Sequence, residues 1–251
     1  MKFKLFITLL LLTSSLISKE IKIAVASNVS YAIEDLKKEF IKLYPDTKIQ
    51  VILGSSGKLT AQISNGAPYQ LFMSADMKYP DALYKKKLAI TKPSVYAYGE
   101  LVLLSNKEQD FSEGFDLLKS DKIKKIAIAN PKTAPYGKAT LQAMKNAKIY
   151  KDIKRKLVYA ESISQTLSYT ITAVDIGFVA KSSLFSPKMQ RFKKGKNWSD
   201  IDSKLYTPIN QGVVILKNGK DDDRVKAFYN FLLSKKTKEI FKRYGYLVPN
   251  D

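Results

Sequence analysis

Short apolar runs alternate along this chain with stretches in which apolar residues recur every three or four positions. The run at residues 21–26 predicts a strand, and residues 31–44 carry Ile33, Leu36, Phe40 and Leu43 at helical spacing. Alternation of this kind is typical of open α/β sheets. The same pattern predicts strands at 48–53, 69–73, 101–104, 126–129, 157–159, 176–179 and 212–216, and helices within 59–63, 79–88, 140–147, 167–174, 224–233 and around 240–241.

So many strands exceed the usual size of one sheet, and we therefore expect two sheets. Ligands of such sheets bind beyond the carboxyl ends of the strands, where the helices begin. Residues 186–203, rich in Lys and Ser, predict a surface loop. The chain shows no internal repeat and no low-complexity stretch, so the strand-to-helix junctions are the places to look for a site.

The first 18 residues have the pattern of a secretory signal peptide. Lys2 and Lys4 precede an apolar run at 5–12, and small residues at 13–18 predict cleavage after Ser18. The apolar run is too short to cross a membrane, which takes about 20 residues. We expect export, to the periplasm in a bacterial context, and the lack of Cys excludes a lipid on an N-terminal cysteine.

The composition excludes most catalytic chemistry, because the 251 residues contain no Cys and no His. Thiol nucleophiles, disulfides, thiolate-bound metals, imidazole bases and histidine metal sites are all absent. An enzyme would have to use carboxylates, Lys, Tyr or a borrowed cofactor. The composition therefore favours a binding protein with no cofactor over an enzyme.

The formal net charge of +20 raises the question of nucleic-acid binding. Only four of the 43 basic residues are arginines, and the lysines are scattered rather than gathered into one groove. Arginine reads bases and pairs with phosphates, whereas lysine is a solvated point charge. We expect a lysine-biased solvated surface and no nucleic-acid partner.

Four junctions share one character, in that small, polar, uncharged residues stand in front of a predicted helix. Each offers backbone N–H groups at a helix N-terminus, which can hold an anion without a counter-charge. Pro135 suits the first position of its helix, where an N–H is not needed. One such junction alone would indicate a plain N-cap, but four together predict a shared site. The four segments are 26–30, 54–57, 133–137 and 161–164.

Other motifs fail on spacing. Residues 54–59 lack the spacing of a phosphate-binding loop and of a nucleophile elbow. The acidic run 221–223 predicts the start of a helix rather than a calcium site. Asp76 is expected to cap a nearby helix or loop, because a carboxylate would repel an anion.

Six segments together resemble the periplasmic molybdate-binding proteins of ABC-type molybdate importers, over nearly the whole mature chain. The resemblance implies an α/β, two-lobed periplasmic binding protein fold of type II, with two mixed sheets flanked by helices and a hinge crossed twice. On that scheme residues 1–18 are the signal peptide, 19–99 and 210–251 form lobe one, and 100–209 form lobe two. The segments that carry the resemblance are 24–27, 54–57, 66–76, 130–137, 175–179 and 241–246.

The resemblance also implies a set of ligand-binding residues. Ser27 and Ser56 would each donate through a hydroxyl and a backbone N–H, and Tyr136 and Ile163 through backbone N–H groups. Some members of the family place a ligand-binding tyrosine where this chain has Ala180. As in another branch of the family, the side chain or N–H of Asn28 could replace that donor. All five residues would contact oxyanion oxygens only, and none would bind the metal directly.

The resemblance thus implies a monomeric periplasmic protein that captures molybdate, and tungstate too, and delivers it to an ABC-transporter permease, without catalysis. Two alternatives stay open. One is a binder of another tetrahedral oxyanion, such as sulfate or phosphate. The other is a secreted carboxylate-using hydrolase, which would need two facing Asp or Glu residues in a cleft.

Overall fold

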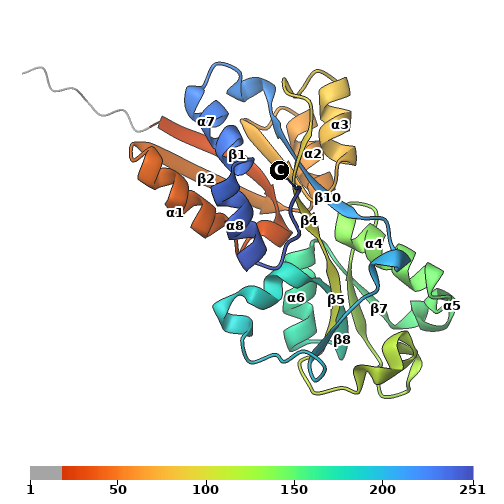
Figure 1. Ribbon diagram of the computed structural model, residues 1–251. Helices are drawn as coiled ribbons and strands as arrows, with labels where there is room; N and C mark the ends of the chain where they lie inside the picture. The colour runs from red at the N-terminus through yellow and green to blue at the C-terminus, as the bar shows by residue number, and fades with distance from the viewer. Residues whose placement is uncertain (1–18, 251) are drawn as a thin grey trace, which may run out of the picture.

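The computed structural model describes residues 19–250, and the predicted signal peptide lies outside them (Figure 1). The described chain forms two lobes, and each lobe is built on a five-stranded mixed sheet. Within residues 19–250, no helix has the length and apolar character needed to cross a lipid bilayer.

The first sheet has the strand order β2-β1-β3-β10-β4. β1 runs parallel to β2 and β3, whereas β10 is antiparallel to β3 and β4. Its strands are β1 (Lys19–Ala26), β2 (Thr47–Gly54), β3 (Leu71–Ser74), β4 (Ser94–Gly99) and β10 (Ile209–Ile215). The helices around it are α1 (Ile33–Leu43), α2 (Ser56–Ser64), α3 (Lys78–Lys85), α7 (Asp223–Leu232) and α8 (Lys235–Arg243).

Alternation along β1 divides its side chains between two cores, one on each face of this sheet. Ile23 and Val25 pack with α1, α7 and α8. In this core the rings of Phe40 and Phe228 pack edge to face, with their centroids 4.9 Å apart. Ala24 points to the opposite face and packs with residues of α2 and α3. The sheet is therefore covered on both faces, as Figure 1 shows.

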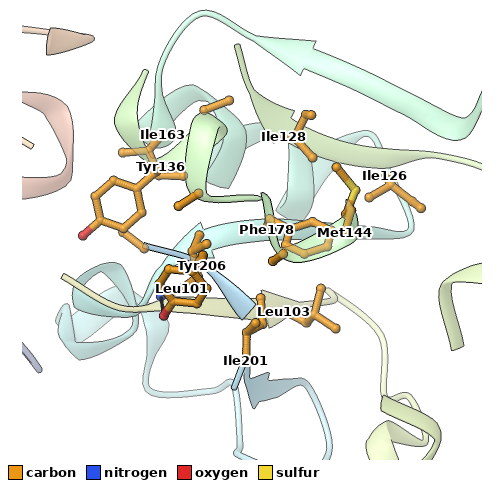
Figure 2. Close-up of a cluster of buried hydrophobic side chains, with 14 of the residues drawn as sticks. Leu101, Leu103, Ile126, Ile128, Tyr136, Met144, Ile163, Phe178, Ile201 and Tyr206 are labelled. Atoms are coloured by element: carbon orange, nitrogen blue, oxygen red, sulfur yellow. Dashed lines mark hydrogen bonds between the residues drawn. The ribbon is translucent and has the colours of Figure 1, made fainter. Parts of the chain in front are cut away.

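The second sheet has the strand order β7-β6-β8-β5-β9. Its largest core packs Ile126 and Ile128 of β6 against Met144 of α4, and Figure 2 shows Tyr136 and Ile163 together at one end of this cluster. The strands are β5 (Leu101–Leu104), β6 (Ile126–Ala129), β7 (Leu157–Ala160), β8 (Ile176–Ala180) and β9 (Trp198–Asp200). The helices are α4 (Pro135–Asn146), α5 (Tyr150–Ile153) and α6 (Ile163–Thr172).

The chain passes between the two sheets twice, as expected. Glu100 alone separates β4 of the first sheet from β5 of the second, and residues 201–208 lead from β9 back to β10. The assignment of residues to lobes at positions 99 and 210 stays a prediction. The remaining elements are short 3-10 helices: η1 (Ser27–Val29), η2 (Phe111–Lys119), η3 (Lys154–Lys156), η4 (Lys181–Phe185), η5 (Pro187–Met189), η6 (Ser203–Leu205) and η7 (Lys217–Gly219).

One sequence-based expectation was wrong. Residues 186–203 are not simply a surface loop, because they contain β9, which pairs with β5. Met189 and Phe192 in this stretch are buried against Val102 and Leu104 of β5. Their two apolar side chains are isolated among lysines and serines, so no period in the sequence reveals them.

The acidic run 221–223 starts a helix, as predicted. The Asp222 carboxylate caps α7 by accepting hydrogen bonds from the N–H groups of Arg224, at 2.9 Å, and Val225, at 3.4 Å. Asp76 likewise accepts the N–H of Tyr79 in the first turn of α3, at 3.3 Å. Burial raises the pKa of the Asp76 carboxyl above its ordinary value.

We expect the Asp222→Ala variant to lose about 1 kcal/mol of the free energy of unfolding, because the first turn of α7 loses its cap. Chemical denaturation measures this change. Asp222→Asn keeps a capping oxygen and should stay close to the wild type. Asp221→Ala, at the exposed neighbouring position, should change the free energy by less than about 0.5 kcal/mol. Equal effects of the two alanine variants would contradict the capping role.

Candidate functional site

All four predicted junctions meet at one cavity between the lobes. The cavity is small, and all five predicted site residues line it. None of the described residues that line it carries a charge. The lining residues are Ala26, Ser27, Asn28, Gly54, Ser55, Ser56, Ala75, Ala134, Pro135, Tyr136 and Ile163.

Strand register explains why the junctions meet. In the first sheet Ala26 at the end of β1 lies opposite Gly54 at the end of β2, so both strands lead into the cavity side by side. In the second sheet Ala129 of β6 lies opposite Ala160 of β7. Since parallel strands end at the same edge of a sheet, each lobe brings two junctions to the cleft.

Three helices begin at the cavity, α2 at Ser56, α4 at Pro135 and α6 at Ile163. The first N–H groups of a helix have no partner within it and carry partial positive charge. Proline has no N–H, so Tyr136 supplies the first donor of α4. The Ser162 hydroxyl accepts from the N–H of Gln165 in α6, which leaves the N–H of Ile163 without that cap.

The Ser56 hydroxyl accepts one hydrogen bond and keeps its own hydrogen available to donate. Its residue is 1% exposed, and its Oγ accepts the N–H of Ala75 at 3.0 Å. Because a serine hydroxyl has a single hydrogen, that hydrogen is left to point elsewhere. The Ser56 carbonyl is engaged separately, since it accepts the Thr60 hydroxyl one turn later.

Side chains and backbone also join the lobes around the cavity. The Ser164 hydroxyl of α6 donates to the Ser27 carbonyl at 2.7 Å. The Ser55 hydroxyl donates to the Glu161 carboxylate at 3.0 Å. The Lys58 Nζ lies 3.9 Å from the same carboxylate, and the side chains of Lys58 and Glu161 are both exposed.

Asn28 is the centre of a buried polar network. Its Nδ2 donates to Gln211 Oε1 at 2.8 Å and to the Tyr246 hydroxyl at 2.9 Å. Its carbonyl accepts the hydroxyls of Tyr246, at 2.8 Å, and of Ser182, at 3.1 Å. Asn28 Oδ1 is buried without a hydrogen-bond partner, which is costly for a polar atom.

Gln211 extends this network to the other lobe. Its Oε1 accepts the Tyr96 hydroxyl at 3.0 Å, and its Nε2 donates to the Tyr136 hydroxyl at 3.1 Å. Burial raises the pKa of Tyr96, Tyr136 and Tyr246 above their ordinary value, so these hydroxyls stay neutral at physiological pH. Tyr136 thus lines the cavity while its hydroxyl belongs to the buried network.

Sequence reasoning missed Gln211 and Tyr246 as neighbours of the site. The available signal for Gln211 was a polar residue inside the apolar strand β10. Tyr246 lies near the end of the chain, and only folding brings it beside Asn28. Ala180 ends β8 opposite Leu101 and is absent from the lining of the cavity.

Among the described residues, the cavity where the junctions meet contains no carboxylate pair. No Asp or Glu lines the cavity, and the described residues contain no group of three or more Asp or Glu arranged to hold a metal ion. Glu161, near its rim, is engaged by Ser55 and Lys58. The cavity is therefore a hydrogen-bonding site built from neutral groups.

We expect Tyr246→Phe to lower the free energy of unfolding by about 1–3 kcal/mol, because Asn28 loses a partner for both its amide and its carbonyl in a buried place. Urea denaturation measures the loss. Tyr244→Phe is the matched control, since the Tyr244 hydroxyl makes one 3.3 Å contact with Asp35 in a half-buried position. If the two variants are equally stable, the Tyr246 hydroxyl does not stabilise the protein through the network around Asn28.

Comparison with known proteins agrees with this geometry. Residues 21–247 match the family model described as bacterial extracellular solute-binding protein. The molybdate-binding proteins of Azotobacter vinelandii and Rhodobacter capsulatus are 36% and 34% identical to the chain, over 90% and 91% of it and 89% and 88% of their own lengths. A solved structure, the periplasmic molybdate-binding protein of Azotobacter vinelandii, superimposes with a TM-score of 0.85 at 32% identity, over 92% of this chain and all of that one. The chain belongs to the family of bacterial extracellular solute-binding proteins.

Proposed function

We propose that this protein binds molybdate in the cavity between its lobes and delivers it to the membrane permease of an ABC transporter. The observation that carries the proposal is the convergence of three helix N-termini and the Ser27 turn on one small, uncharged cavity. The relatives named as molybdate-binding proteins support the choice of ligand. The family is one of solute-binding proteins, and this sets the hydrolase alternative aside.

Neutral donors suit a dianion enclosed between two lobes. A buried charge without hydrogen bonds is very costly, so every oxygen of the anion needs a donor. In this proposal Ser27 and Ser56 each donate a hydroxyl and an N–H, and Tyr136 and Ile163 each donate an N–H. Hydrogen bonds to a charged acceptor contribute about 1.5–3 kcal/mol each, so five to seven of them offset the loss of water.

Asn28 completes the donor set through its N–H or through its side chain. In the arrangement described above, Nδ2 serves Gln211 and Tyr246, and Oδ1 has no partner. The side-chain amide of Asn28 can be turned over so that its oxygen and nitrogen exchange places. If the Gln211 amide is turned over with it, Gln211 keeps its contacts with Tyr96 and Tyr136, with donor and acceptor reversed. The backbone carbonyl of Asn28 then still accepts the Ser182 hydroxyl. The side-chain position that had no partner is then occupied by the amide nitrogen, which is a donor. In that arrangement the side chain of Asn28 would donate to the anion in place of the tyrosine absent at Ala180.

The proposal extends to the setting of the site. Tungstate is nearly the same size as molybdate and should bind too, whereas sulfate should fit poorly because donors fixed for longer metal–oxygen bonds do not reach it. A signal peptide at residues 1–18 would place the mature chain, as a monomer, in the periplasm. Residues 19–99 and 210–251 would move as one lobe and residues 100–209 as the other, closing on the ligand.

Thermal unfolding of the mature protein with each anion tests the function. A ligand that binds only the folded state adds about 2.7 kcal/mol at about 100 times its dissociation constant. We expect molybdate and tungstate to raise the melting temperature, and sulfate and phosphate at equal concentration to leave it unchanged. A higher melting temperature with sulfate or phosphate alone would show that the ligand is that anion and not molybdate. An unchanged melting temperature with all four anions would overturn the proposed function.

Substitution of single donors tests the site. Ser56→Ala should weaken molybdate binding by about tenfold to a hundredfold, the value of one hydrogen bond to a charged group. Asn28→Ala should weaken it as well, and Thr60→Ala, which removes a hydroxyl one turn along α2, should not. Isothermal titration calorimetry measures all three. If Asn28→Ala binds like the wild type while Ser56→Ala does not, Asn28 has no part in holding the anion.

A further inference from the structure

The two lobes touch backbone to backbone at one place beside the cavity. The N–H of Gly57, in the first turn of α2, donates to the carbonyl of Thr133 at 2.8 Å. Thr133 lies in the turn that leads into α4 on the other lobe. Tyr79 of α3 reaches the same carbonyl, with its hydroxyl 3.5 Å away. This contact joins the starts of two helices that both line the cavity.

A side chain at position 57 would not fit this contact. A Cβ there would lie 2.8 Å from the Thr133 carbonyl oxygen and 2.9 Å from its Cα, closer than side-chain carbons approach such atoms. It would also lie 2.7 Å from the Tyr79 hydroxyl, which can rotate away. The Thr133 atoms belong to the backbone, so they can move only if the lobes separate or the turn before α4 shifts.

The local backbone does not account for the glycine. Gly57 is helical, without the positive φ that four other glycines of the described chain adopt. Alanine is more stable than glycine at a helical position, because it loses less backbone entropy on folding. The contact across the cleft is thus the feature that excludes a larger residue at position 57.

The other contacts between the lobes near the cavity are of a different kind. Ser55 with Glu161, and Ser164 with the Ser27 carbonyl, each involve a rotatable side chain. Such contacts can adjust to a small change in the separation of the lobes, whereas two packed backbones cannot. The contact at Gly57 is the rigid one of this set.

We propose that Gly57 is a positioning residue, whose bare backbone sets the closest approach of the two lobes and so the width of the anion cavity. The inference rests on the proposed function and deepens it. Ser56 precedes Gly57 directly, and Tyr136 follows Thr133 by three residues, so the contact spaces the donors of one lobe from those of the other. Held apart, the donors of the two lobes no longer reach one tetrahedral anion together.

The test compares Gly57→Ala with Ala61→Ser, a control that also adds one heavy atom to α2 but at an exposed position. Titration calorimetry gives the affinity for molybdate and tungstate, and small-angle X-ray scattering gives the radius of gyration with and without molybdate. We expect Gly57→Ala to weaken both anions at least tenfold and about equally. It should also become less compact with molybdate than the wild type does, and Gly57→Val should show a larger effect.

A purely structural role would give a different result. Because alanine favours the helix, the unliganded Gly57→Ala protein should melt no lower than Ala61→Ser. A lower melting temperature without ligand, with the ligand-induced compaction retained, would overturn the inference. So would wild-type affinity in Gly57→Ala when Ala61→Ser and the wild type both bind. If the wild type binds no oxyanion at all, the proposed function fails first and this inference with it.

Discussion

The buried hydrogen-bond network around Asn28 and Gln211 is the interaction on which the rest of the site depends. It connects the turn after β1, the strand β10, the end of the chain at Tyr246 and, through the Tyr136 hydroxyl, the start of α4 on the other lobe. Buried polar groups are costly when unpaired, so the members of such a network hold one another in place. Gln211 holds the hydroxyl of Tyr136, a residue that also lines the cavity, so the network fixes the start of α4 beside the cavity.

The same network also constrains the strand β4, which leads from one lobe to the other. Gly99 ends β4, and a Cβ there would lie 2.6 Å from Gln211 Nε2 and in direct overlap with the Tyr136 hydroxyl. Only a glycine lets the hinge strand pass this close to the network. The passage between the lobes, the polar network and the cavity thus lie in contact, and a change in the angle between the lobes acts directly on the groups that line the cleft.

Much of the fold follows from local pattern. The run 21–26 and the period of 31–44 predict β1 and α1, and small polar residues before the helices indicate the junctions that line the cavity. These features depend on neighbours in the sequence, so the sequence displays them. The partnership of Asn28 with Tyr246 and the contact of Gly57 with Thr133 join residues far apart in the chain, and no local period announces them. The prediction for residues 186–203 was wrong for a related reason. Met189 and Phe192 are buried against β5, a strand that lies far from them in the sequence.

The distribution of charge separates attraction from recognition. The chain carries a formal charge of +20, yet none of the described residues that line the cavity is charged. A basic surface raises the local concentration of any anion and cannot distinguish one oxyanion from another. Lysines inside the cavity would extend that tolerance to the site, because a flexible point charge adapts to anions of many sizes. Helix N–H groups and a hydroxyl held by Ala75 cannot adapt in this way, so in the proposed site the distance between the lobes would decide which anion fits.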